Sequence, residues 1–167
     1  MAQIIQNKIF TIYGKPGTGK TFFATMLASA YRRIYANVEI RRHGKIVSNR
    51  IENISDLEHI HFSPIKGIVI IDEGGVNVNA RQSMSEGNME FGKLGMLGRK
   101  KNVDIIVISQ LERMTDVYFR ELSTASFKMR SWYVSADKLM FDFSLLDADG
   151  NDQWTKFVDL FEWSKKT

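Results

Sequence analysis

GKPGTGKT, at residues 14–21, is the stretch that decides the fold of this chain of 167 residues. Its glycines carry no side chain, so successive backbone N–H groups can surround phosphate oxygens at the start of a helix. In this pattern Lys20 reaches the outer phosphates and the Thr21 hydroxyl binds Mg²⁺. The predicted nucleotide-binding residues are Gly14, Lys15, Pro16, Gly17, Thr18, Gly19, Lys20, Thr21 and Phe22.

The residues on both sides of this stretch support the prediction. The run KIFTIYG is β-branched and aromatic, and we expect a strand at about Ile9–Tyr13. Apolar residues at helical spacing then predict a helix from about Lys20 to Tyr35. A strand before the motif and a helix after it form the context in which such a loop binds phosphate.

A second stretch, GIVIIDE at residues 67–73, is an apolar strand that ends in two acids. Such a run is typical of a central strand covered on both faces. Asp72 suits a magnesium ion, and Glu73 suits the polarisation of an attacking water molecule. The alternative is a polar end to a buried strand. Beside a phosphate-binding loop, the acid pair predicts hydrolysis of a nucleoside triphosphate.

Composition places this site in an ordinary globular chain, with 44% hydrophobic and 25% charged residues. We expect a single domain over residues 1–167, with a core at about 9–130 and a β-rich part at about 131–167. The absence of cysteine excludes disulfides, thiolate catalysis and the usual structural zinc sites. Mg²⁺ held by oxygen is the only metal implied.

The formal net charge is +4, and the positive residues are grouped. Residues 37–50, NVEIRRHGKIVSNR, predict two short polar strands joined at Gly44. Arg41, Arg42 and Lys45 on this hairpin are our candidates for contact with DNA, because basic clusters suit a polyanion. A solvated charged face is the alternative.

Strand-like and helix-like segments alternate, which predicts an α/β domain with a mainly parallel sheet. Between the two motifs we expect a short helix over ISDLEHI, capped by Asn53 or Ser55. A loop to about Ser85 and a helix at 86–101 precede the strand DIIVISQ, which ends in Gln110. A short helix at 115–122 and three strand-like stretches then follow: ASFKMRSWYV, KLMFDFSLL and QWTKFVDLFEW.

Gln110 is a further candidate site residue. In a parallel sheet it would emerge at the same edge as the phosphate-binding loop, where it could contact the γ-phosphate or hold the attacking water. The alternative is a strand-end amide that caps a turn. The order of loop, acid pair and polar strand end belongs to the additional-strand class of P-loop ATPases.

Residues 79–123 resemble the zonula occludens toxin-like ATPases of filamentous phages, within the broader HerA and FtsK class of DNA-pumping motors. The resemblance lies in the preceding acid pair, an Arg-Gln-Ser-Met-Ser segment, a helix ending in Arg-Lys, a strand ending in Gln, and an Arg-containing short helix. With the phosphate-binding loop it covers about residues 9–130. It implies an additional-strand, RecA-like three-layer sandwich, ATP and Mg²⁺ as cofactors, and a DNA translocase that works as a ring.

The same resemblance assigns a role to each site residue. Lys20 is assigned to the phosphates, and Thr21 and Asp72 are assigned to Mg²⁺. Glu73 is then the base and Gln110 the sensor. Arg99 takes the place of an arginine that reaches the nucleotide of an adjacent subunit. Its rivals are Arg113 and Arg120, and its alternative role is that of a helix-end cation.

Packaging of a viral genome is the leading interpretation, with a pentameric or hexameric ring docked on a capsid vertex, portal or membrane protein. Filamentous-phage assembly proteins continue into a membrane span, whereas this sequence has no stretch of ~18 apolar residues. We therefore expect a compact motor in the host-cell cytoplasm, with association with the virion as the alternative. Other open functions are a virion assembly or export ATPase, a nucleotide kinase, an AAA-type helicase loader and a non-hydrolysing scaffold.

Overall fold

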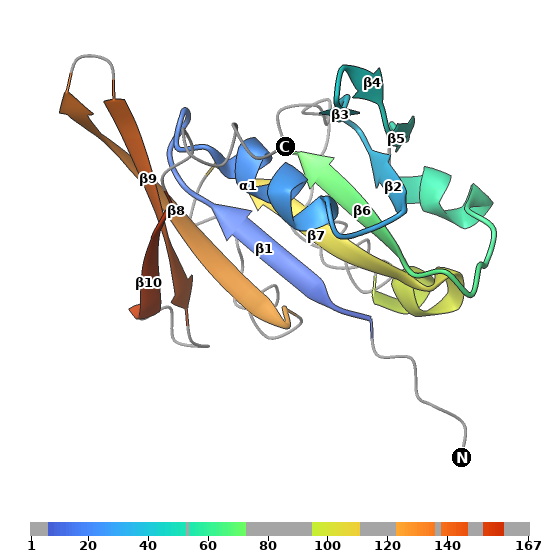
Figure 1. Cartoon of the computed structure of the whole chain (residues 1–167). Helices are drawn as coiled ribbons and strands as arrows, with labels where there is room; N and C mark the ends of the chain where they lie inside the picture. Colours follow the sequence, from blue (N-terminus) through green and yellow to red (C-terminus); the bar gives the residue numbers. More distant parts are fainter. Residues whose placement is uncertain are drawn as a thin grey trace, which may run out of the picture.

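A sheet of eight strands runs through the protein in the order β10-β9-β8-β1-β7-β6-β2-β5 (Figure 1). The computed structural model describes residues 7–52, 54–72, 95–110, 123–135, 138–146 and 152–158. The strands are β1 (Ile9–Tyr13), β2 (Arg33–Ala36), β5 (Ser48–Arg50), β6 (Gly67–Asp72), β7 (Val103–Ser109), β8 (Ala125–Ser135), β9 (Lys138–Leu146) and β10 (Asp152–Val158). From β5 to β8 neighbouring strands are parallel, and β8, β9 and β10 pair antiparallel.

The position of β7 confirms the predicted fold class. β7 lies between β1, which leads into the phosphate-binding loop, and β6, which ends in Asp72. A strand inserted between these two is what defines the additional-strand architecture. The carboxyl ends of β1, β7 and β6 therefore meet at one edge of the sheet, which we call the carboxyl edge; the opposite one is the amino edge.

Layers of packed side chains cover both faces of the sheet. On one face, helix α1 (Lys20–Ala28) contributes Phe23 and Ala24 to a cluster with Ile68 and Ile70 of β6. On the other face, the 3₁₀ helix η1 (Ile54–His59) and the helical residues 95–101 accompany Val69 and Ile71 of the same strand; the cluster includes Leu57 and Leu97. Because β6 is buried on both faces, its apolar run is continuous rather than alternating.

The predicted helix from Lys20 to Tyr35 is wrong in its second half. Helix α1 ends at Ala28, and Arg33–Ala36 form β2 instead. Hydrogen bonding to β6 on one side and β5 on the other makes β2 an internal strand, with Ile34 and Ala36 buried. Sheet pairing and burial outweigh the helical spacing that the sequence shows.

The predicted helix over ISDLEHI is present as η1, and one of its two predicted caps is excluded. The 3₁₀ helix begins at Ile54, so Ser55 lies inside it, and Asn53 lies outside the described residues. The carboxylate of Asp56 accepts a hydrogen bond from the Glu52 backbone N–H at 2.7 Å. A first-turn acid therefore holds the chain where it enters this helix.

The predicted polar hairpin is confirmed. β3 (Arg41–Arg42) and β4 (Lys45–Ile46) form a separate two-stranded sheet whose turn has positive φ at His43 (49°) and Gly44 (76°). Two successive residues with positive φ are what a tight two-residue hairpin requires. The following residues, Ser48–Arg50, leave the hairpin and join the main sheet beside β2.

The strands predicted after residue 123 are present as β8, β9 and β10, and the end of the last predicted stretch, residues 159–163, lies outside the described residues. β8 pairs with β1 and continues past residue 130, so one strand crosses the expected limit between core and β-rich part. Phe127 of β8 and Phe143 of β9 pack against Phe23 of α1, with ring centroids 5.3 and 4.6 Å away. These contacts fasten the β-rich part to the helix that follows the phosphate-binding loop.

Residues 95–101 confirm the end of the helix predicted at 86–101. The start of that helix, the loop after Asp72 and the helix predicted at 115–122 lie outside the described residues. Among the residues that the structure describes, no helix is long and apolar enough to span a membrane.

Candidate nucleotide-binding and catalytic site

The loop between β1 and α1 has the backbone that its glycines predict. Gly17 and Gly19 have φ values of 77° and 78°, in the left-handed region that favours glycine. Gly14 has another reason to be glycine, because a Cβ there would lie 2.5 Å from the carbonyl oxygen of Met129 in β8. The loop therefore passes directly over the backbone of the neighbouring strand, a contact that sequence spacing alone does not reveal.

Lys20 is the first residue of α1, and its ammonium group is held inside the loop. Its Nζ donates hydrogen bonds to the carbonyl oxygens of Gly14 and Lys15, both at 2.8 Å. The Thr18 hydroxyl also donates to the Lys15 carbonyl, at 2.8 Å. Lys20 and Thr18 are buried, so the loop is closed around a cation at the positive end of a helix of nine residues. This arrangement suits a polyphosphate.

Thr21 and Asp72 meet at the carboxyl edge, as the two motifs predict. The Thr21 hydroxyl donates a hydrogen bond to Oδ2 of Asp72 at 2.6 Å. A hydroxyl and a carboxylate in contact are the oxygen donors that Mg²⁺ takes in this class of site. The residues thus fit a magnesium-bound nucleotide: Thr21 and Asp72 would hold the ion, which neutralises phosphate charge when bound.

Asn37 is a site residue that the sequence analysis missed. It follows β2 directly, and its Nδ2 donates to the carbonyl oxygen of Asp72 at 2.7 Å. Its Oδ1 accepts a hydrogen bond from the backbone N–H of Asp72 at 2.8 Å. No motif spacing links residues 35 positions apart, so only the pairing of β2 with β6 reveals this contact.

Gln110 lies at the predicted edge. It follows Ser109, the last residue of β7, which is in register with Tyr13 at the end of β1. On the other side of β7, Ile108 is in register with Asp72. Gln110 is exposed there, between the phosphate-binding loop and the acid of β6. This placement is compatible with the sensor role, which stays a prediction.

Arg99 is not brought to this site by the fold of its own chain. It lies in the helical residues 95–101, and its carbonyl oxygen accepts a hydrogen bond from Asn102, just before β7 begins. The seven residues of β7 separate this amino edge from the carboxyl edge, a distance of about 20 Å. Three other predicted residues lie outside the described part of the chain: Glu73, Arg113 and Arg120.

The basic hairpin is exposed, but its arginines are engaged by the protein itself. Arg41 pairs with Glu39 at 2.5 Å. Arg42 donates to the carbonyl oxygen of Ser29 at 2.6 Å, which satisfies a backbone group at the C-terminal end of α1. Lys45 is exposed. The hairpin is therefore bonded to the same helix whose first turn holds Lys20.

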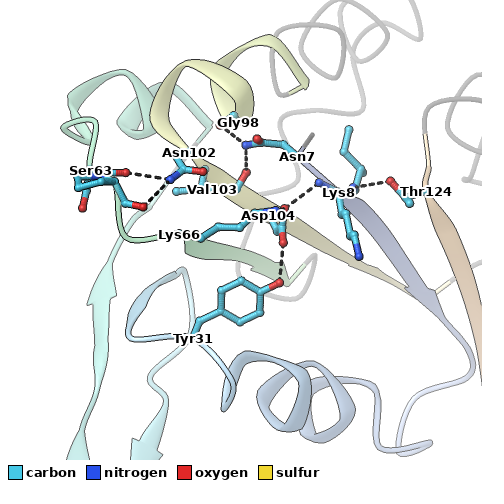
Figure 2. Close-up of polar contacts among 12 residues, drawn as sticks. Asn7, Lys8, Tyr31, Ser63, Lys66, Gly98, Asn102, Val103, Asp104 and Thr124 are labelled. Carbon is cyan, nitrogen blue, oxygen red and sulfur yellow. Dashed lines mark hydrogen bonds and ion pairs between the residues drawn. The ribbon is translucent and has the colours of Figure 1, made fainter. Parts of the chain in front are cut away.

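The amino edge carries a polar network centred on Asp104 of β7 (Figure 2). The Asp104 carboxylate is buried and accepts hydrogen bonds from the Lys8 backbone N–H at 2.8 Å and from the Tyr31 hydroxyl at 2.5 Å. It also pairs with the ammonium group of Lys66 at 2.9 Å. Burial, the hydrogen bond to Asp104 and its negative charge together raise the pKa of Tyr31 well above its ordinary value.

The sequence of this chain matches a known protein family. The profile of the ATPase family associated with various cellular activities (AAA) matches residues 10–117, more than half of the chain, and ends before β8. No curated protein matches.

Two solved structures show the same fold. The N-terminal domain of zonular occludens toxin from Neisseria meningitidis has a TM-score of 0.60 and 19% identity, covering 92% of this chain and 94% of that one. The flagellar accessory protein FlaH from Methanocaldococcus jannaschii has a TM-score of 0.54 and 14% identity, covering 90% and 84%. The resemblance to zonula occludens toxin-like proteins is thus confirmed in the fold, and with the matched profile and the assembled phosphate-binding loop it follows that this chain is a P-loop ATPase that belongs to the AAA family.

Proposed function

We propose that this ATPase is a DNA translocase that acts as a ring and packages a viral genome. The observation that carries the proposal is the hydrogen bond from Arg42 of the basic hairpin to Ser29 at the end of α1. It connects an exposed, positively charged surface to the helix that begins at the phosphate-binding loop. In this proposal the nucleic-acid contact and the nucleotide contact lie at the two ends of one helix about 13 Å long.

In this proposal the chemistry occurs at the carboxyl edge. Lys20 and the loop N–H groups bind the phosphates of ATP, with Thr21 and Asp72 at its Mg²⁺. Glu73, next to Asp72, takes the proton from the attacking water, and Gln110 orients that water or contacts the γ-phosphate. Loss of the γ-phosphate changes the charge at the start of α1. The hairpin is bonded to the other end of α1 and moves with the helix.

The ring supplies what a single subunit lacks. Arg99 lies at the amino edge of its own sheet, so it can serve catalysis only at the site of a neighbouring subunit. We propose a ring of five or six subunits inside a host cell. A capsid vertex, portal or membrane protein is its docking partner.

The test is the ATPase rate of the purified protein with and without DNA. We expect DNA to stimulate turnover, since a translocase hydrolyses ATP most rapidly on its track. Equal rates in both conditions would contradict the motor. Phosphorylated product formed from added nucleosides would indicate a nucleotide kinase instead.

The hairpin is tested by Lys45→Ala, with Lys100→Ala as the matched control. Both lysines are exposed, but Lys100 lies in the helical residues 95–101. Contact with one phosphate contributes about −0.9 to the slope of log affinity against log salt concentration. We expect Lys45→Ala to weaken DNA binding and flatten that slope by about this amount, while Lys100→Ala changes neither. Identical salt dependence in the two variants would exclude the hairpin as the DNA-binding surface.

A further inference from the structure

Asn37 lies outside both sequence motifs and forms two hydrogen bonds to Asp72 near the nucleotide site. It is half-buried and follows the last residue of β2. Its backbone N–H still donates to the carbonyl oxygen of Ile70 at 3.3 Å, which extends the pairing of β2 with β6 by one residue. Beyond this point the chain turns away toward the hairpin, while β6 continues to Asp72.

The side chain of Asn37 continues the hydrogen bonding to β6 at the point where the backbone of β2 turns away. A carboxamide has the same donor and acceptor as a peptide group. Nδ2 of Asn37 bonds the carbonyl oxygen of Asp72 at 2.7 Å, and Oδ1 accepts from the Asp72 N–H at 2.8 Å. One side chain thus satisfies both backbone groups of Asp72 and fixes its peptide planes on either side.

The consequence reaches the nucleotide site through Asp72. The carboxylate of Asp72 contacts the Thr21 hydroxyl at 2.6 Å, and its orientation depends on the backbone that carries it. Groups that hold the ligands of a metal ion set its affinity, because a displacement of a few tenths of an ångström weakens ion coordination. Loss of the Asn37 bonds would leave the last residue of β6 held only on the side of β7.

We infer that Asn37 is a positioning residue that holds the backbone of Asp72 so that its carboxylate, with Thr21, binds the magnesium ion of the nucleotide. Asn37 itself does not contact the nucleotide in this role. The inference concerns the ATPase site alone and does not depend on DNA or on a ring.

The decisive variant is Asn37→Leu, which keeps the approximate shape of the side chain and removes both hydrogen bonds. Its matched control is Asn49→Leu. The Nδ2 of Asn49 also bonds a backbone carbonyl of a neighbouring strand, that of Ile34 at 3.2 Å, but Asn49 lies in β5, away from Asp72. Asn49→Leu therefore loses one bond of the same kind at a place away from the site, whereas Asn37→Leu loses two bonds to Asp72.

Binding is measured with a fluorescent ATP analogue, first in EDTA and then in a magnesium titration. For Asn37→Leu we expect unchanged affinity in EDTA, because the phosphate-binding loop is intact. The magnesium concentration that gives half-maximal tightening should rise at least tenfold, and kcat should fall by a similar factor. Asn49→Leu should match the parent protein in all three quantities.

A role confined to the stability of the fold would lower affinity equally with and without magnesium. That result, or an unchanged magnesium dependence in Asn37→Leu, would overturn the inference. If Asn37→Leu does not fold, Asn37→Ser replaces it, because serine keeps one hydrogen-bonding group. Asn37→Ser should show a smaller shift of the magnesium titration in the same direction, and no shift would again overturn the inference.

Discussion

Asp72 and Asp104 lie on the adjacent strands β6 and β7, at opposite edges of one sheet, and their carboxylates have different partners. Asp104 is 1% exposed, and its carboxylate is used by Lys8, Tyr31 and Lys66 of the protein itself. Asp72 is half-buried at the carboxyl edge and contacts the Thr21 hydroxyl.

The difference between the two acids comes from what surrounds their backbones. Asp104 is the second residue of β7, in register with Ile68 of β6, and because it is buried its side chain must find protein partners. β6 leaves the sheet at Asp72, where its parallel neighbours also end, and donors gather at a common edge. One carboxylate therefore stabilises the fold, and the other remains accessible to a ligand.

Exchanging each aspartate for alanine separates the two functions most strongly. We expect Asp72→Ala to abolish measurable ATP turnover, because the magnesium ion loses a ligand, with little effect on the unfolding free energy. Asp104→Ala should leave kcat of the folded protein unchanged and lower the unfolding free energy by about 3 kcal/mol, since Tyr31 and Lys66 lose their partner. ATPase assays and urea unfolding of both variants measure this.

A loss of turnover in folded Asp104→Ala would break the comparison, because the amino edge would then contribute to the chemistry. Assays are made without urea and well below the unfolding temperature of the variant, where both proteins are almost fully folded. Equal losses of unfolding free energy in the two variants would also contradict the comparison, because Asp72 would then stabilise the fold as much as Asp104 does.

The arginine at the amino edge gives the next largest effect. Since Arg99 cannot reach its own site across the sheet, Arg99→Ala should bind ATP normally and hydrolyse it roughly 10³-fold more slowly if it serves a neighbour. Mixing it with Glu73→Gln should restore some turnover, because some interfaces then pair an intact Glu73 with an intact Arg99. Steady-state ATPase rates over a range of mixing ratios measure the rescue.

The control for this mixing experiment is Arg99→Ala combined with the Lys20→Ala protein, which lacks phosphate binding and should also be rescued. Absence of rescue in both mixtures, with turnover independent of protein concentration, would leave Arg99 as a cation at a helix end. The amino edge of one subunit would then make no contribution to the nucleotide site of its neighbour.

Sequence patterns located the phosphate-binding loop and Asp72 at the carboxyl edge, because phosphate binding dictates local spacing. The glycines, Lys20 and Thr21 are fixed by one loop, and Asp72 by the end of an apolar strand. The two strands of the basic hairpin were equally predictable from Gly44 and its polar neighbours. In each case the deciding interactions lie within a few residues of one another.

The rest depended on contacts between distant segments. Asp104 bonds Lys8 across 96 positions, and Asn37 bonds Asp72 across 35. Neither residue belongs to a motif, so spacing gave no signal for either. The helix predicted through Tyr35 failed for the same reason, because β2 forms by pairing with β6 and β5, and no local pattern encodes those partners.

Substitution of Tyr31 has the smallest expected effect, and it tests a single hydrogen bond at the amino edge, the one to Asp104. Its pKa is raised in the folded protein by burial and by Asp104. Above about pH 10 the unfolded chain therefore loses the tyrosine proton before the folded protein does, and stability falls as pH rises. Tyr31→Phe should lower the unfolding free energy by about 1–2 kcal/mol at pH 8, because Asp104 loses a hydrogen bond. Its stability should then decline less steeply than that of the parent protein above pH 10.

Lys66, which also faces Asp104, is present in both proteins. The difference in unfolding free energy between parent and Tyr31→Phe therefore isolates the tyrosine. Urea unfolding at pH 8 and again above pH 10 should show that difference shrinking as pH rises. A difference that stays constant would mean that the Tyr31 hydroxyl contributes by packing rather than by its bond to the Asp104 carboxylate. In either case ATP turnover per folded molecule should be the same in both proteins at pH 8, since Tyr31 lies at the edge of the sheet opposite the nucleotide.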